Sequence, residues 1–199
     1  MMGIKRILFL GSASLVFLSA CAQHLPQEVP YQRDPEVPSL DLLQKEVKQD
    51  LSALRSKLVV DDKGMGEYIY SLNGKVYNGW VVQVLPENEH KYRFMHLDSG
   101  WVDWQIGYYA SGTLDFDFHQ KDGFSLGSER MWYQDGKPYV DNFYGGLHQK
   151  EGLQSRWYAS GQLAYQALYK DQKTVYEVSF DEQGKITERR GELPELWSK

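Results

Sequence analysis

The chain has 199 residues, of which 42% are hydrophobic and 14% aromatic, and its formal net charge at pH 7 is −5. This acidic balance argues against binding to nucleic acid or to anionic lipid headgroups. The single cysteine, Cys21, excludes an intramolecular disulfide and a metal site built from several cysteines. The 14 tyrosines and 18 glycines are typical of short strands joined by tight turns.

The first 20 residues have the organisation of a secretory leader. A positive start with Lys5 and Arg6 precedes an apolar run from Ile7 to Phe17, and small residues follow. This order is typical of a signal peptide. The apolar run is too short and too early to be interpreted as a membrane span.

The segment Leu18-Ser19-Ala20-Cys21 resembles the lipobox of bacterial lipoprotein signal peptides. The resemblance implies cleavage before Cys21 and acylation of that residue, which takes the formal charge from −5 to −7 as Lys5 and Arg6 are removed. Several acyl chains anchor stably, since each buried methylene contributes about 0.8 kcal/mol. Because Ala22 follows the cysteine, the resemblance implies the outer membrane, facing the periplasm, in a Gram-negative host. The alternative is an ordinary signal peptide with an incidental cysteine.

The next two segments differ in composition. Residues 21–38 contain four prolines among polar residues, which predicts an extended tether to the membrane. Over residues 39–60, apolar residues recur at spacings of three or four, which predicts one amphipathic helix. Its apolar stripe is compatible with packing on its own domain, with a coiled coil or with docking of a partner. The stripe consists of Leu40, Leu43, Val47, Leu51, Leu54 and Leu58.

From residue 67 to 190 the chain repeats itself about every 24 residues. Three central copies read YYASG at 108–112, WYQDG at 132–136 and WYASG at 157–161, and further glycine turns lie between them. Glycine suits such turns because it adopts positive φ without a Cβ clash. The predicted turn glycines are Gly74, Gly100, Gly112, Gly123, Gly136, Gly146, Gly161 and Gly184.

This pattern resembles the MORN repeat, most closely the short bacterial variant often assigned as the antitoxin of a toxin–antitoxin pair. The resemblance is firm in the three central copies and weaker in the first and last. It implies a mainly β fold, an elongated and curled antiparallel meander with one hairpin per repeat. The amphipathic helix at 39–60 precedes the meander and would cap its N-terminal edge. Residues 191–199 form a C-terminal tail.

One predicted strand carries the residues closest to a catalytic pattern. Asp115, Asp117 and His119 fall on one face of it. This set is compatible with a divalent cation or a hydrolase, but a solvated sheet face gives the same pattern. Because no nucleophile motif, phosphate loop or dinucleotide fingerprint is present, we expect no catalysis, metal or cofactor. A hydrolase using the two aspartates is the least favoured hypothesis.

The tryptophans outside the repeat frame, Trp101, Trp104 and Trp197, are the candidate binding aromatics. Trp132 and Trp157 lie within the frame and are expected to pack between repeats. The sequence thus predicts a lipid-anchored envelope protein that recognises another envelope protein, and the family resemblance adds neutralisation of a toxin. Binding of an envelope glycan such as peptidoglycan is the alternative.

Overall fold

A computed structural model describes residues 37–60, 66–85, 90–122, 124–146 and 148–192. The predicted leader and tether up to residue 36, with Cys21, lie outside the described residues. Gly123 and the end of the predicted tail from residue 193, with Trp197, also lie outside them.

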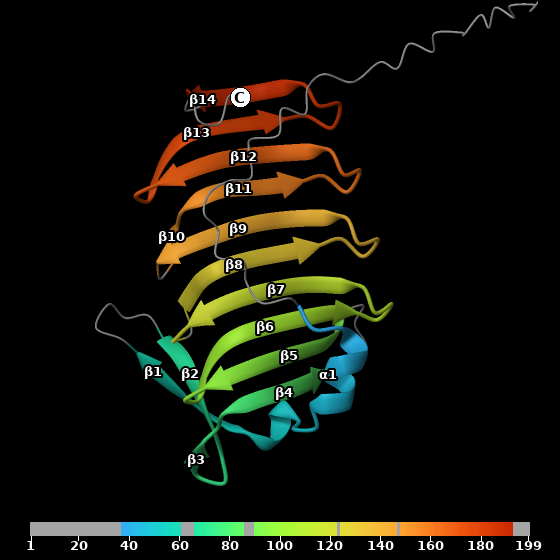
Figure 1. Cartoon of the computed structure of the whole chain (residues 1–199), viewed down its shortest axis with the longest axis vertical. Coiled ribbons are helices and arrows are strands. Elements are labelled where there is room, and N and C mark those ends of the chain that lie inside the picture. The colour runs from blue at the N-terminus through green and yellow to red at the C-terminus, as the bar shows by residue number, and fades with distance from the viewer. Residues whose placement is uncertain (1–36, 61–65, 86–89, 123, 147, 193–199) are drawn as a thin grey trace, which may run out of the picture.

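The described chain forms one large and one small antiparallel sheet, with 65% of its residues in strands (Figure 1). The small sheet consists of β1 (Arg55–Val60), β2 (Gly66–Leu72) and β3 (Lys75–Val76). The large sheet consists of β4 (Gly79–Val84), β5 (His90–Asp98), β6 (Trp101–Tyr109), β7 (Leu114–Lys121), β8 (Phe124–Trp132), β9 (Pro138–Gly146), β10 (Gln149–Lys150), β11 (Gly152–Trp157), β12 (Leu163–Lys170), β13 (Lys173–Phe180) and β14 (Ile186–Gly191). From β4 to β14 each strand pairs with its neighbour in the chain, except that the short β10 pairs only with β9. The predicted curled antiparallel meander after one helix is confirmed.

The helix itself is shorter than predicted. Helix α1 spans Leu40–Glu46, a 3-10 turn η1 follows at Leu51–Ala53, and residues 55–60 form strand β1, so one helix over 39–60 is wrong. The carbonyl of Gln49 accepts a hydrogen bond from the Val82 amide of β4 at 2.9 Å. The edge of the large sheet therefore takes up a backbone group that a continued helix would have used.

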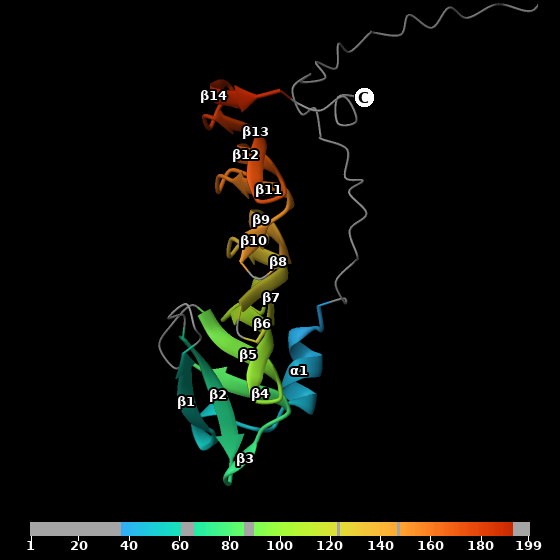
Figure 2. The same ribbon diagram turned by 90° about the vertical axis from the view of Figure 1, so that its left-hand side faces the viewer.

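Helix α1 covers one face of the large sheet at its N-terminal end, and we call this side the helix face (Figure 2). Leu43 and Val47 are buried there against Phe94, Ile106 and Tyr108. Each fully buried apolar side chain contributes about 1.5–3 kcal/mol, so this cluster fixes α1 on the sheet. The interpretation that the apolar stripe packs on its own domain therefore holds for this turn of helix.

The opposite side, the hairpin face, is covered at the same end by the small sheet (Figure 2). Val81, Met95 and Leu97 are buried there, and Leu51 and Leu54 pack against them. The apolar residues that were predicted to form one helical stripe therefore pack on both faces of the large sheet. The chain passes from one face to the other at the edge strand β4, between Val47 and Leu51.

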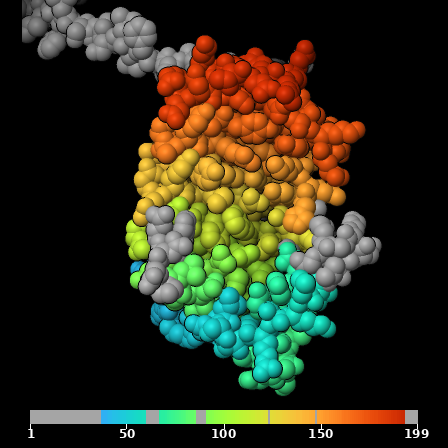
Figure 3. Space-filling model, turned by 180° about the vertical axis from the view of Figure 1, so that it is seen from behind, coloured from blue at the N-terminus to red at the C-terminus, as the bar shows by residue number. Residues whose placement is uncertain are grey.

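Beyond β7 the sheet is a single layer. Seen edge-on, strands β8–β14 rise above α1 and the small sheet, and no described element covers either face (Figure 2). The view from behind shows the hairpin face of these strands as one broad surface beyond the small sheet (Figure 3). A single layer cannot bury a complete apolar face, so other interactions are needed to hold the strands together.

A tyrosine from each central repeat supplies such an interaction. Its hydroxyl donates a hydrogen bond to a backbone carbonyl of the next repeat. These bonds run from Tyr109 to Trp132 at 2.8 Å, from Tyr133 to Trp157 at 2.7 Å and from Tyr158 to Phe180 at 2.8 Å. The repeat of about 24 residues in the sequence therefore corresponds to a repeated bridge between successive hairpins.

Six of the predicted turn glycines have φ between +77° and +92°, namely Gly74, Gly100, Gly112, Gly136, Gly161 and Gly184. Gly146 is different, and its assignment to a turn is wrong. It is the last residue of β9 and pairs with Gln149, and the following residue with a positive φ among those described is His148, at +55°. The turn thus lies beyond the Gly145-Gly146 pair that marked it in the sequence.

Two of these glycines provide a matched test of the link between the two sheets. A Cβ on Gly100 would lie 2.7 Å from Ile69 Cγ1 and 2.8 Å from the Tyr70 carbonyl oxygen, whereas a Cβ on Gly74 would meet open space. Their φ values are nearly the same, +79° and +77°. We expect Gly74→Ala to lower the free energy of unfolding by about 1 kcal/mol, and Gly100→Ala by about 3 kcal/mol. Urea denaturation measures both, and equal losses would contradict the close packing at Gly100.

The bridge between repeats is tested by Tyr133→Phe. The substitution leaves the ring in place but removes the donor to the Trp157 carbonyl, so we expect a loss of about 1–2 kcal/mol in unfolding free energy. Tyr139, whose ring centroid lies 5.0 Å from that of Tyr133, is 39% exposed. Tyr139→Phe is therefore the control and should change stability by less than about 0.5 kcal/mol. A similar loss in both variants would show that the bridge contributes nothing.

Candidate functional site

A polar cluster on the helix face of β6–β8 contains two of the residues singled out from the sequence. Asp117 is fully buried, and it accepts a hydrogen bond from Trp104 Nε1 at 2.6 Å. Arg130 donates to the other carboxylate oxygen through Nε at 3.0 Å and also through Nη2. His119 Nε2 lies 3.4 Å from Asp117 Oδ1. Both oxygens of Asp117 are therefore engaged by neighbouring side chains.

These contacts decide the charge of Asp117. Burial alone raises the pKa of a carboxyl group, but the adjacent His119 and the hydrogen bonds from Trp104 and Arg130 outweigh it, and the pKa of Asp117 lies below its ordinary value. The group is a buried carboxylate at neutral pH and does not have the raised pKa of a general acid. Its geometry gives it a structural role in joining three neighbouring strands.

The interpretation of the aspartate-bearing face of β7 as a solvated face is wrong. Asp115 is 4% exposed and Asp117 is 0% exposed, while Phe116 and Phe118 on the other face are only partly buried. The carboxylate side of β7 is thus more buried than the phenylalanine side. A buried carboxylate is tolerated where a cation and hydrogen-bond donors face it. The two phenylalanine rings stack on each other on the hairpin face, with centroids 4.7 Å apart.

Trp104 does not present a free ring on the surface. Its ring stacks on His119 with centroids 4.9 Å apart, and it packs against Trp80 at 5.3 Å. Its indole N–H is used by Asp117. A sugar stacks on an open aromatic face, so Trp104 fits a packing role better than a binding role.

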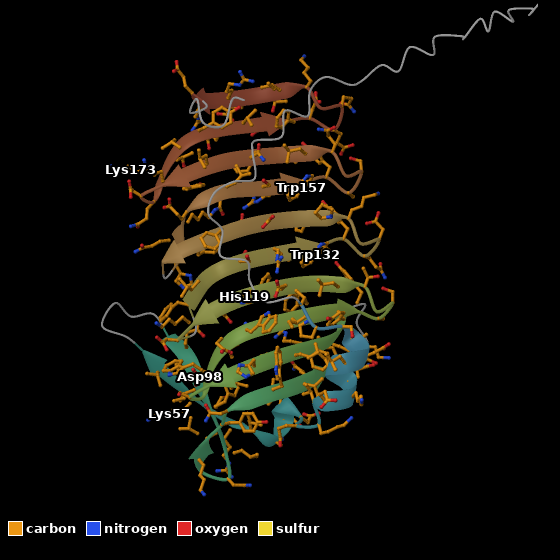
Figure 4. The ribbon with its side chains drawn as sticks, in the orientation of Figure 1. Lys57, Asp98, His119, Trp132, Trp157 and Lys173 are labelled. Carbon is orange, nitrogen blue, oxygen red and sulfur yellow. The ribbon has the colours of Figure 1, made fainter. Side chains whose placement is uncertain are left out.

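The other candidate aromatics do not join Trp104 in one site. Trp101 is the first residue of β6, opposite Asp98, and is partly buried. Trp132 and Trp157 lie further along the helix face of the sheet, each partly buried (Figure 4). The guanidinium of Arg130 lies 5.9 Å from the centroid of the Trp132 ring.

A different cluster occupies the uncovered hairpin face. Its centre is three tyrosines, Tyr144 from β9 and Tyr165 and Tyr169 from β12. Tyr165 lies opposite Arg156 of β11 in the strand register and donates a hydrogen bond to Glu177 Oε2 at 3.1 Å. Because residues alternate between faces along a strand, this register places the cluster on the side away from α1.

Cations surround these tyrosines. Lys150 Nζ lies 5.5 Å from the centroid of the Tyr169 ring, and Arg190, whose side chain is 73% exposed, lies 3.3 Å from Glu177. Burial, followed by the nearby charge of Glu129, raises the pKa of Tyr144 to about 12, so its hydroxyl is a neutral donor at physiological pH. We call this cluster the tyrosine patch, made up of Tyr144, Lys150, Arg156, Tyr165, Tyr169, Glu177 and Arg190.

Sequence reasoning missed the tyrosine patch because it weighed tryptophans outside the repeat frame. A signal was present, since Tyr165 and Tyr169 are four residues apart and must share one face of a strand. What the sequence could not supply is the register that brings Tyr144 and Arg156 beside them.

A metal site and a membrane-spanning helix are both absent from the described residues. There, no group of three or more His, Cys, Asp or Glu side chains is arranged to hold a metal ion. No helix among the described residues has the length and apolar character needed to cross a membrane. No protein-family model and no curated protein matches the chain.

The structural role of Asp117 gives a prediction with a defined pH dependence. A carboxylate whose pKa is depressed on folding stabilises the fold above its unfolded pKa of about 3.9, and this stabilisation is lost as the pH falls through the folded value. We expect Asp117→Asn to lower the unfolding free energy by about 2–4 kcal/mol at neutral pH, because Arg130 loses its anionic partner. The difference in unfolding free energy between this variant and the unmodified protein should become smaller as the pH falls below about 4.

The control for this variant is Asp135→Asn, which alters an exposed carboxylate paired with Lys137 at 2.8 Å. Hydrogen bonds from Lys137 also lower the pKa of Asp135, but exposed ion pairs are screened by water and contribute little to stability. This variant should therefore lose much less unfolding free energy than Asp117→Asn at neutral pH. Urea denaturation over a pH series measures both variants. A pH-independent loss in Asp117→Asn would contradict the charged state assigned to the group.

Proposed function

We propose that this chain is a lipid-anchored cell-envelope protein that binds another protein through the open hairpin face of its sheet. The observation that carries the proposal is the tyrosine patch on a sheet surface that no described element covers. Tyrosine and arginine are enriched at the energetic centres of protein interfaces, because they combine a large contact area with hydrogen-bond donors. The repeated hydrogen bonds between hairpins would hold such a surface in one shape before the partner arrives.

The position of the patch suits an anchored protein. The lipobox-like segment ending at Cys21 supports attachment to the membrane upstream of the fold. The described chain starts beside α1, where the Tyr108 hydroxyl donates to the Pro38 carbonyl. The tyrosine patch lies on β9–β14, further along the sheet (Figure 2). An anchor joined at the covered end would leave the open strands accessible.

The resemblance to MORN repeats is part of this proposal, because it also favours recognition over catalysis. Its antitoxin version would make the partner a toxin, but no described residue points to a particular toxin. We therefore propose protein recognition as the activity and treat a toxin as one kind of partner.

Envelope glycan remains the competing ligand. A site for it would need open aromatic rings beside polar side chains, and the partly buried Trp132 and Trp157 on the helix face are the nearest approach to that arrangement (Figure 4). The two hypotheses therefore use opposite faces of the sheet, and one experiment can separate them.

We expect a photo-activated cross-linker placed at Lys150, on the hairpin face, to trap one protein partner in envelope membranes. The matched position is Leu42 on α1, which is 49% exposed and belongs to the helix-face side. Adding Arg156→Glu to the Lys150 probe should reduce the adduct about tenfold, since a reversed charge in the patch opposes binding. Lys173→Glu, at the first residue of β13, is the control and should leave the adduct unchanged.

Mass spectrometry of the adducts decides the outcome. A partner trapped only from Leu42, or an adduct that carries only polysaccharide, would contradict recognition through the hairpin face. Cys21→Ser in the same membranes tests the anchor, and we expect the variant to remain uncleaved or to lose acyl labelling. Normal acylation and membrane retention of Cys21→Ser would refute the proposed attachment.

A further inference from the structure

Strand β1 is an edge strand that the tyrosine patch does not involve. In the small sheet the strands are ordered β1-β2-β3, and β1 pairs only with β2, from Arg55 opposite Ser71 to Val60 opposite Gly66. One edge of β1 therefore has no strand partner in the described part of the chain. Residues 55–59 are all exposed. Such an edge is a template on which a further strand can form.

The two faces of β1 differ in chemistry. Leu58 lies opposite Tyr68 of β2, and both side chains are 50% exposed, so they form an apolar pair on one face. Arg55 and Lys57 alternate with Leu58 and therefore belong to the other face. Val59, which is 38% exposed, shares the face of the two cations. A neighbouring strand would therefore meet two cations and Val59 on one side and the apolar pair on the other.

The charge of this edge identifies the kind of partner. The whole chain carries a formal charge of −5, yet β1 contains two cations and no acidic residue. Within the described residues, neither Arg55 nor Lys57 forms an ion pair. Pairing of β1 with a second copy would bring four cations together, and like charges across a strand pair are destabilising. The edge thus favours an acidic partner over its own kind.

We propose that β1 binds an extended segment of another protein, in which acidic and apolar side chains alternate, as an added strand. The acidic side chains would face Arg55 and Lys57, and the apolar ones would extend the surface of Leu58 and Tyr68. Backbone hydrogen bonds supply affinity in this mode of recognition, and the alternating side chains supply specificity. The two cations also disfavour pairing of β1 with a neutral or basic strand, and this gives the site its specificity for an acidic partner.

This site is separate from the tyrosine patch, so it goes beyond the proposed function and does not depend on it. The patch lies on β9–β14 of the large sheet, whereas Lys57 lies in the small sheet at the covered end (Figure 4). The partner segment can belong to the protein bound at the patch or to a different one, and the test below does not require either to be known.

The test uses the purified full-length protein and two fluorescein-labelled peptides of equal length, one of alternating Glu and Val and one of alternating Lys and Val. Fluorescence anisotropy should show the Glu-Val peptide binding about tenfold more tightly than the Lys-Val peptide, with the difference shrinking at high salt. Hydrogen exchange at residues 55–59 should slow when the Glu-Val peptide is bound, because an added strand protects the edge amides. No binding of the Glu-Val peptide, or equal binding of both, would overturn the proposal.

Charge reversal gives the decisive comparison. Arg55→Glu with Lys57→Glu should invert the preference, so that the Lys-Val peptide binds more tightly. Lys170→Glu with Lys173→Glu makes the same change of charge at the far end of the large sheet and should leave the original preference intact. If both double variants change binding alike, the effect comes from net charge and the site at β1 is excluded.

A third substitution keeps the test valid if charge reversal disturbs the small sheet. Leu58→Ser removes the apolar contact while leaving both cations, and it should weaken binding of the Glu-Val peptide with unchanged salt dependence. Arg156→Glu, in the tyrosine patch, should leave peptide binding unchanged, so failure of the patch and failure of β1 give different results. Unaltered binding by Leu58→Ser would show that the apolar pair takes no part in binding and would overturn the proposed recognition of apolar side chains.

Discussion

The hydrogen bond from a repeat tyrosine to the next repeat's backbone is the interaction on which the open part of this fold depends. Strands β8–β14 form one layer, so they cannot exclude water from a complete face. The hydroxyls of Tyr109, Tyr133 and Tyr158 link successive hairpins at 2.7–2.8 Å and recur with the period of the sequence. Because each bridge joins nearest neighbours, stability accumulates along the sheet as in other repeat proteins.

Adjacent parts of the sheet bury their side chains by different means. At the covered end, α1 and the small sheet bury Phe94 on one face and Leu97 on the other. Just beyond that cover, the buried group is Asp117, held by Trp104 and Arg130. Such a polar centre depends on its donors and specifies one register of β6, β7 and β8, because a slip by one residue would leave the carboxylate unpaired.

Much of the architecture could be predicted from the sequence, and the failures have physical causes. The spacing of Gly112, Gly136 and Gly161 predicts the meander because a turn with positive φ constrains the residue type locally. The prediction of one helix over 39–60 was wrong because apolar periodicity does not show that the Gln49 carbonyl accepts a hydrogen bond from an edge strand. Neither the burial of Asp117 nor the tyrosine patch could be predicted, since both depend on register across strands that are distant in sequence.

The division of the molecule into a covered end and an open end accounts for where binding surfaces can occur. A face that packs against α1 or the small sheet is used for stability, so recognition is left to surfaces beyond that cover or at its rim. The tyrosine patch lies beyond it, and β1 is its rim, exposed because the small sheet has only three strands. The two surfaces differ in chemistry, since the patch offers rigid tyrosines and mixed charges while β1 offers a backbone edge with cations on one face. Under these two proposals the chain would hold a folded partner on the sheet and an extended segment at the edge, because neither surface overlaps the buried clusters at the covered end.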